Sequence, residues 1–384
     1  MHIFSIRIQL MFHTLLEELS KVKIPLIGRI EENENQLINT TIFWKNFHWD
    51  TMKYKKSFFH WLRRKESVLL QIQEKTYKEI LSKKERNILL EEIENRLLKV
   101  EFLRNVYNIE AQKIDPTIQI YYSQGIDIYN KAFFWVTKKD IGDHNIIQEC
   151  PIFENIYKKS VLLELIKYSQ SICPEIQFKF WKYPNFSHSA WVLRIPNQKY
   201  YNLQNIITLF FHEVTHFFRS FNGERNMGFK FQFAGYSSLE EGIAIYNEYL
   251  YGNKICNYGS FIPYYNICIK YLLQDVSEEE KKENIYQVLS CKGFSRERSL
   301  QYYNRFYKYC KLWETHLFLK DLIYYNGYKN VKKLIRKDSH NYDAIMAWDI
   351  GLEELQANIV DPYNNYDYKK YFRLMTKRIK EIQK

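Results

Sequence analysis

Two histidines and a glutamate in the segment FHEVTHFFRSFNG (211–223) have the spacing of a zinc-binding helix. An α-helix advances about 3.6 residues per turn, so His212 and His216 project from the same face. Two imidazoles four residues apart can bind one tetrahedral zinc ion, and Glu213 can reach a water molecule on that ion. The segment therefore predicts a catalytic helix in which His212 and His216 are zinc ligands and Glu213 is the general base.

The residues around this motif are apolar on nearly every side of the predicted helix. No helix breaker precedes Asn222–Gly223, which is a typical helix end. A helix of this kind belongs in the protein interior, where two histidines without a partner would be costly. A bound metal satisfies them; the alternative is that they are core histidines satisfied by hydrogen bonds alone.

A zinc site of this kind needs a third protein ligand. The metzincin extension of the motif requires Gly at 219 and His at 222, and Arg219 and Asn222 exclude it. A glutamate on a following helix is the other source, and the segment YSSLEEGIAIYNEYL (236–250) offers two. We predict Glu241 as the third ligand, with Glu240 as the second choice.

Two further expectations concern the start of this glutamate helix. The small residues Gly242 and Ala244 are expected to let it pack closely against the histidine helix. Ser238 and Glu241 also fit a capping box, in which Glu241 would only bind a backbone N–H. The sequence leaves the ligand and the capping interpretation open for Glu241 taken alone.

These segments resemble the microtubule-associated tyrosine carboxypeptidase family and its bacterial relatives with a Gln-Glu-Gly-Leu-Ala-type motif. RSFNGER (219–225) matches an arginine-containing stretch that follows the family's zinc motif, and LEEGIA (239–244) matches its Glu-Glu-Gly-Leu-Ala segment. FLKDLIYYNGYKNV (318–331) matches a later Phe-Thr-Lys-Asp-x-x-Tyr-x-x-Gly segment. The resemblance covers about residues 120–365, in the same order and at similar spacings.

The histidine motif departs from the family in one respect. Family members usually have three residues between the glutamate and the second histidine, whereas only Val214 and Thr215 intervene here. The shorter form is the regular i, i+4 spacing of zinc helices, so metal binding is still expected. The departure leaves the local helix geometry and the register of the substrate open.

The expected reaction is hydrolysis of a peptide bond. Zn²⁺ held by His212, His216 and Glu241 leaves one position for water, and the metal lowers the pKa of that water toward about 7. Glu213 is expected to take a proton from the water and later to deliver one to the leaving amine. Tyr324 is the predicted oxyanion donor; the alternative is that its hydroxyl binds a structural partner.

The resemblance implies release of a C-terminal Tyr or Phe from a peptide or protein. Arg225 and Lys320 lie in segments matched to the family and are the predicted ligands of the terminal carboxylate, because cations pair with carboxylates. Arg219 is a third candidate, although it can instead pair with a structural acid. The strand 189–196 is expected to offer a free edge to an extended substrate. His188 at its start either supports the metal centre from outside the ligand set or is only a turn residue, and we favour the turn.

Two other functions fit the motif. One is a zinc aminopeptidase or endopeptidase of the same glutamate-liganded type, which would need an acidic group for the substrate's amino terminus. The other is a noncatalytic binding module with a structural metal or none. Glu213 argues against the second, because a structural site needs ligands but no base.

Composition and charge constrain the partners. The 384 residues have a formal net charge of +12, which favours an acidic partner such as an acidic peptide tail. No nucleic-acid-binding motif occurs, and a solvated basic surface is the simpler interpretation. The six cysteines form no Cys-x-x-Cys pair, and we find no signal peptide and no apolar run of about 18 residues. A cytoplasmic protein without a membrane span is expected; the oligomeric state stays open.

The elements that must position these residues are mainly helical, since the chain has only 12 Gly and 8 Pro. We expect a boundary at Asp115–Pro116, with a helical region of unknown role at 1–115 and a zinc metallopeptidase domain, tyrosine carboxypeptidase-like, at 116–384. The predicted fold class is α+β, mainly helical and zincin-like, with a glutamate ligand and a small sheet beside the histidine helix. Strands are expected at 117–122, 132–137, 176–183 and 189–196, and helices at 54–108, 155–170, 203–221, 238–251, 262–273, 278–290, 295–325, 328–336 and 341–356.

Overall fold

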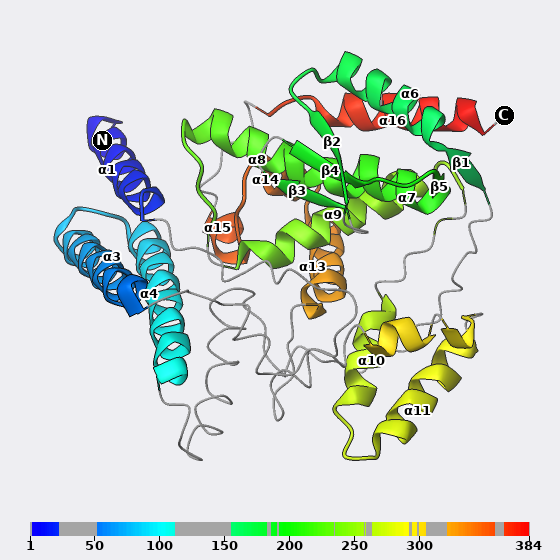
Figure 1. Ribbon diagram of the computed structural model, residues 1–384. Coiled ribbons are helices and arrows are strands. Elements are labelled where there is room, and N and C mark those ends of the chain that lie inside the picture. The colour runs from blue at the N-terminus through cyan, green and yellow to red at the C-terminus, as the bar shows by residue number, and fades with distance from the viewer. Residues whose placement is uncertain are drawn as a thin grey trace. The chain divides into compact units, whose positions relative to one another are not determined.

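The structure, a computed structural model, is mainly helical with two small sheets (Figure 1). It describes residues 2–22, 52–111, 155–182, 186–189, 192–233, 235–256, 258, 263–291, 294–297, 299–304, 321–357 and 365–383. The chain divides into two compact units, one made of residues 1–144 and 264–322 and the other of 145–263 and 323–384. The expected boundary at Asp115–Pro116 and the expected strands at 117–122 and 132–137 lie outside the described residues.

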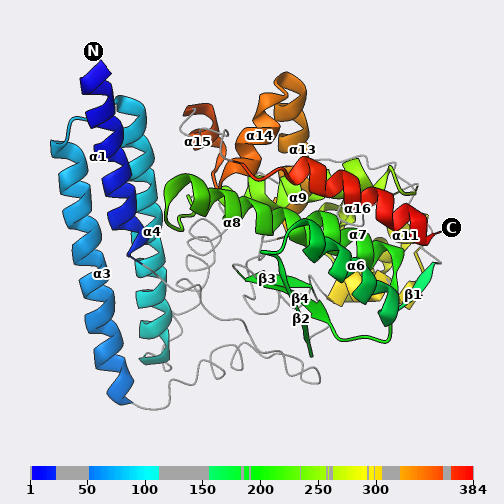
Figure 2. The same ribbon diagram turned by 90° about the horizontal axis from the view of Figure 1, so that it is seen from above.

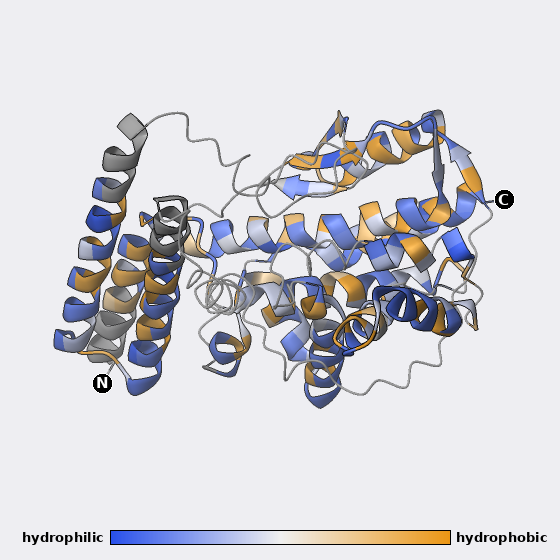
Figure 3. Ribbon diagram, turned by 60° about the horizontal axis from the view of Figure 1, so that its bottom comes forward, coloured by the Kyte–Doolittle hydropathy of each residue, from blue (hydrophilic) through white to orange (hydrophobic). Residues whose placement is uncertain are grey.

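In the first unit, three long helices pack side by side (Figure 2): α1 (His2–Ser20), α3 (Met52–Lys78) and α4 (Lys83–Ala111). Leu residues on their facing sides are fully buried, among them Leu16, Leu69 and Leu89. Figure 3 shows hydrophobic residues on the facing sides and hydrophilic residues on the outer sides of these helices. This is the amphipathic pattern expected for 54–108. The unit also contains α10 (Pro263–Leu272) and α11 (Glu278–Ser290).

The second unit contains both sheets. Strand β1 (Ile156–Lys158) pairs antiparallel with β5 (Tyr200–Asn202), and helix α6 (Lys159–Ile172) follows β1 directly. The other sheet has the order β2-β4-β3, in which β4 (Val192–Pro196) runs parallel to β2 (Gln177–Trp181) and antiparallel to β3 (Ser187–Ser189). The prediction that segment 189–196 offers a free edge is therefore wrong, because β4 has a partner on each side. His188 lies in β3 and not in a turn.

The histidine motif lies in a continuous helical segment, residues 203–227, which we call the motif helix. It consists of α7 (Leu203–Ile207), a π-helical turn η3 (Thr208–Glu213) and α8 (Val214–Met227). A reciprocal capping box of Asn202 and Asn205 starts it.

The motif helix ends later than predicted. Gly228 terminates it with φ 75°, a left-handed conformation that glycine adopts without strain. Gly223 is not the helix end. A Cβ atom there would lie 2.5 Å from Cδ1 of the Trp348 indole, so this glycine permits close contact with that ring.

The glutamate helix α9 (Tyr236–Gly252) packs against the motif helix. Gly235, with φ 68°, is its N-cap residue, so Ser238 lies inside the helix and the capping box considered as the alternative role of Glu241 does not form. Gly242 was expected to face the motif helix. It faces instead the backbone of Gly327 in α13 (Leu322–Lys337).

The remaining helices of this unit are α14 (His340–Ala347), α15 (Leu352–Ala357) and α16 (Tyr368–Ile382). Packing of α14 against α8, and of α16 against η3 and α9, buries the motif helix among other elements. No described helix of the protein is long and apolar enough to cross a membrane.

The burial of the Glu354 side chain in α15 can be tested by the pH dependence of stability. Its side chain is buried and accepts a hydrogen bond from the Gly351 N–H at 2.8 Å, and burial raises the pKa of Glu354 from 4.5 to about 7. Because the pKa is raised in the folded state, the contribution of Glu354 to the free energy of unfolding is fully present below pH 4.5. It falls by up to about 3 kcal/mol as the pH rises through 7. Glu354→Gln should therefore unfold at a higher temperature than the wild type at pH 8, with a smaller difference at pH 5. Thermal unfolding at both pH values measures this; equal pH dependence in the two proteins would contradict it.

Candidate metal centre

A π-helical turn places His212 and Glu213 at the centre of the motif helix. The N–H of Val214 bonds to the carbonyl of Leu209, five residues earlier, as in a π-helix. Such turns are rare and occur often at functional sites. His212, Glu213 and His216 are only 7%, 9% and 2% exposed, so the motif is buried as the apolar surroundings predicted.

Helix α9 places a carboxylate between the two motif histidines. Glu241 Oε2 lies 3.3 Å from His212 Nε2 and 3.6 Å from His216 Nε2. Of the described residues, His212, His216 and Glu241 form one of two groups whose ligand atoms lie within 4.8 Å of one another. Glu241 Oε2 is also buried without a hydrogen-bond partner among the described residues. Two imidazole nitrogens and a carboxylate oxygen are a zinc donor set, so these residues fit that metal.

Each of the two histidines also faces a second carboxylate of α9 through its other nitrogen. His212 Nδ1 lies 3.2 Å from Glu248 Oε2, and His216 Nδ1 lies 3.2 Å from Glu240 Oε1. Metal-binding histidines usually hydrogen-bond to a carboxylate through their second nitrogen, which fixes the tautomer and the ring orientation. His212 makes this hydrogen bond to Glu248, whereas His216 Nδ1 and Glu240 Oε1 approach each other without hydrogen-bond geometry. Glu240 and Glu248 thus occupy outer positions, while Glu241 lies between the two Nε2 atoms.

Glu248 is itself held in place by two hydroxyl groups. Thr208, in the π-helical turn, donates a hydrogen bond to Glu248 Oε1 at 2.7 Å, and the Tyr258 hydroxyl donates to the same oxygen at 2.5 Å. These two hydrogen bonds fix the orientation of the buried carboxylate toward His212.

A second group of possible ligands, His188, His216 and Glu240, shares one histidine with the first. Its imidazoles are stacked, with ring centroids 4.3 Å apart and planes 13° apart, so their lone pairs lie in two nearly parallel, separated planes. The rings of His212 and His216 are 72° apart, and their lone pairs can converge on one ion. Ring geometry therefore favours the first group as the metal site.

The charges of the site favour a cation. Burial alone would lower the pKa of both motif histidines, but Glu241 and Glu248 raise the pKa of His212, and Glu241 and Glu240 raise that of His216 to about 10. Burial would likewise raise the pKa of Glu241, but the two histidines hold it well below its ordinary value. A metal ion has to displace the histidine protons, so proton release accompanies its binding.

Glu213 points toward the same centre from the motif helix. Burial would raise its pKa, but the nearby imidazole of His188 and the charges of His212 and His216 lower it. The carboxylate is therefore ionised and available as a proton acceptor beside the metal ligands.

The other predicted site residues lie in different surroundings. Arg219 is fully buried and donates hydrogen bonds to the carbonyls of Trp348 and Ile350 at 2.7 and 3.4 Å. Arg225 is exposed in the last turn of α8, with its guanidinium 5.5 Å from the centre of the Phe221 ring.

Tyr324 and Lys320 belong to the segment around the start of α13. Tyr324 is half-buried and lies one turn before Gly327, where α13 contacts α9 next to Glu241. Lys320 lies outside the described residues. The roles of these four residues toward a substrate stay predictions.

The sequence analysis missed Glu248, Tyr258 and Thr208 as parts of the site. A signal for Glu248 exists, because it follows Glu241 by seven residues and so lies on the same helix face two turns later. Tyr258 and Thr208 come from a loop and from the π-helical turn, and their approach to Glu248 depends on tertiary packing.

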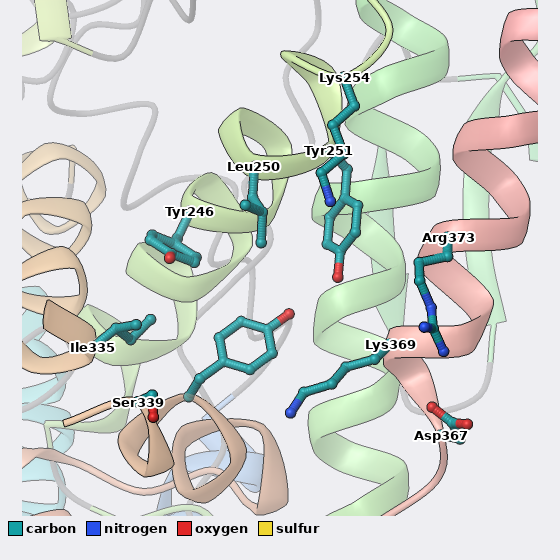
Figure 4. Close-up of a pocket in the computed structure, with 10 residues that line it drawn as sticks. Tyr246, Leu250, Tyr251, Lys254, Ile335, Ser339, Asp367, Lys369 and Arg373 are labelled. Carbon is teal, nitrogen blue, oxygen red and sulfur yellow. The ribbon is translucent and has the colours of Figure 1, made fainter.

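A separate cavity of about 450 Å³ lies between α9, α13, α14 and α16 (Figure 4). Leu250, which lines it, follows Glu241 by nine residues, about 180° around the helix, so the cavity lies on the opposite face of α9. Figure 4 shows Lys369 and Arg373 of α16 at one side of the cavity, with the Arg373 guanidinium directed toward Asp367. None of the predicted site residues lines this cavity, and it is distinct from the metal centre.

Replacing Glu248 tests the outer contacts. In a Glu248→Gln protein the amide is a weaker acceptor for His212, so we expect zinc affinity to fall about 10- to 100-fold. Competition with a chromogenic chelator measures this, and Glu164→Gln, on the exposed side of α6, is the matched control. Unchanged affinity would show that Glu248 does not orient His212.

A family model described as microtubule-associated tyrosine carboxypeptidase matches residues 183–351. The match contains the motif helix, α9 and Tyr324, and over this range it confirms the resemblance inferred from the sequence. No curated protein and no solved structure matches the chain.

Proposed function

Because residues 183–351 match the microtubule-associated tyrosine carboxypeptidase family, we propose that this protein is a zinc-dependent carboxypeptidase that removes a C-terminal Tyr or Phe. The observation that carries the metal part of the proposal is the approach of Glu241 Oε2 to both His212 Nε2 and His216 Nε2. The family match supports the reaction type and a C-terminal tyrosine; release of Phe is part of the proposal.

In this proposal His212, His216 and Glu241 hold the metal, and Glu240 and Glu248 orient the two histidines. Zinc bound there supplies a Lewis acid for the scissile carbonyl and lowers the pKa of water. Glu213 accepts a proton from the attacking water and returns it to the nitrogen of the leaving amino acid. Its ionised carboxylate, beside the metal ligands, supports this role.

The substrate is proposed to be a peptide or protein that ends in an aromatic residue within an acidic tail. The net charge of +12 supports an acidic partner. Arg225, Lys320 and Arg219 remain the candidates for the terminal carboxylate, and Tyr324 for the oxyanion. Of these, Arg225 is an exposed cation, whereas Arg219 already binds two backbone carbonyls.

Paired peptides test the proposal. Zinc-loaded protein is incubated with an acidic peptide that ends in Tyr, with the same peptide amidated at its C-terminus, and with a peptide that ends in Ala, and mass spectrometry follows the products. We expect Tyr to be released only from the free-carboxylate Tyr peptide. Cleavage of the amidated peptide as well would indicate an aminopeptidase or endopeptidase. No cleavage of any peptide, with zinc bound, would favour a noncatalytic binding module.

A further inference from the structure

His188 lies at the metal centre although it is outside the motif that predicted the centre. It lies in strand β3, which is an edge of the three-stranded sheet within the described residues. Its Nδ1 is 3.6 Å from Glu213 Oε2 and its Nε2 is 3.9 Å from Glu240 Oε1. Its ring stacks on that of His216.

The environment of His188 differs from that of the two motif histidines. Its side chain is 30% exposed, against 9% for His212 and 2% for His216, so it lies on the more open side of the centre. The parallel stacking on His216 disfavours a role as a ligand to the same metal ion. An imidazole that is partly exposed and adjacent to a candidate general base has a position from which it can influence the reaction.

The contact with Glu213 is the most informative one. Among the described residues, His188 is the only basic side chain within 4 Å of the Glu213 carboxylate. The closest approach joins His188 Nδ1 to Glu213 Oε2. A carboxylate held through one oxygen presents the other in a fixed direction, as a general base requires.

We propose that His188 is a positioning residue that acts through Glu213. It holds Oε2, so that Oε1 takes the proton from the attacking water and returns it to the leaving amine. The stack on His216 and the approach to Glu240 keep the imidazole in place. This inference rests on the proposed hydrolytic function, and it adds a residue that the histidine motif does not contain.

The test compares His188→Ala, His188→Asn and the control Ser187→Ala, whose side chain points to the other face of β3. For His188→Ala we expect kcat to fall roughly 100-fold, with KM and zinc affinity within about threefold of the wild type. His188→Asn places an amide N–H near the position of Nδ1 and should recover part of kcat. Thermal unfolding establishes that each variant is folded.

A double-mutant cycle with Glu213→Gln separates an action through Glu213 from an independent one. The readouts are kcat and, without turnover, the dissociation constant of phenylalanine hydroxamate measured by calorimetry. A hydroxamate binds zinc and hydrogen-bonds to the neighbouring base. In the wild-type background we expect His188→Ala to lower kcat and to raise the dissociation constant of the hydroxamate. In the Glu213→Gln background we expect it to change neither quantity.

Three outcomes would overturn the proposal: loss of zinc in His188→Ala, an effect on KM alone, or equal effects in both backgrounds. If the wild-type protein cleaves no peptide, the proposed function fails while the hydroxamate cycle still decides whether His188 acts through Glu213.

Discussion

A Glu213→Gln protein is expected to bind zinc as the wild type does and to lose about 10²- to 10⁴-fold in kcat. Gln has nearly the same shape as Glu but cannot accept a proton. Glu213 contacts His188, whereas both Nε2 atoms approach Glu241, so the substitution leaves the ligand set intact. Release of Tyr from the free-carboxylate peptide gives kcat, and chelator competition gives the zinc affinity.

Glu164→Gln on α6 is the control for this experiment, because that exposed carboxylate lies on another helix. Undiminished turnover in Glu213→Gln would contradict the proposed mechanism. Loss of zinc together with turnover would instead make Glu213 part of the metal-binding set.

The second large expected effect distinguishes Glu241 from Glu240 as the third metal ligand. Glu241→Gln removes a charged ligand atom that lies between both Nε2 atoms, whereas Glu240→Gln changes contacts with His216 Nδ1 and His188 Nε2, outside the predicted ligand set. We expect Glu240→Gln to lower zinc affinity by about 10- to 100-fold and Glu241→Gln to lower it further.

Thermal unfolding with and without added zinc gives an independent measure of the same two variants. A ligand at 1,000 times its dissociation constant stabilises the folded state by about 4 kcal/mol, and this gain should be lost in Glu241→Gln at zinc concentrations that still stabilise the wild type. A larger loss of zinc-dependent stabilisation in Glu240→Gln would make Glu240 the metal ligand and Glu241 the outer residue.

The parts of the site that the sequence predicted depend on local geometry. His212 and His216 share a helix face because they are four residues apart, and the structure brings both to Glu241. The predicted helices at 203–221, 238–251 and 278–290 correspond to the motif helix, α9 and α11, since long apolar periodic segments indicate helices reliably.

The parts that the sequence did not predict depend on contacts between distant segments. His188 was expected in a turn, because nothing in PNFSHS indicates that it pairs with Leu193 in a strand. Gly223 was interpreted as a helix end, although its lack of a side chain serves contact with Trp348, 125 residues later in the chain. Gly242 was assigned to the wrong neighbour for the same reason, because small residues indicate close packing but not the identity of the partner.

The π-helical turn at Thr208–Glu213 also affects how chain length and site geometry are related. A π-helical turn holds one residue more than an α-helical turn. One residue can therefore be inserted or deleted at such a turn while the helices on both sides keep their buried faces. The number of residues between Glu213 and the second histidine then does not alone determine how far apart the two imidazoles lie. Alignments of this helix with proteins of the longer motif place the additional residue directly after this turn, and should be judged by which nitrogens face the glutamate helix.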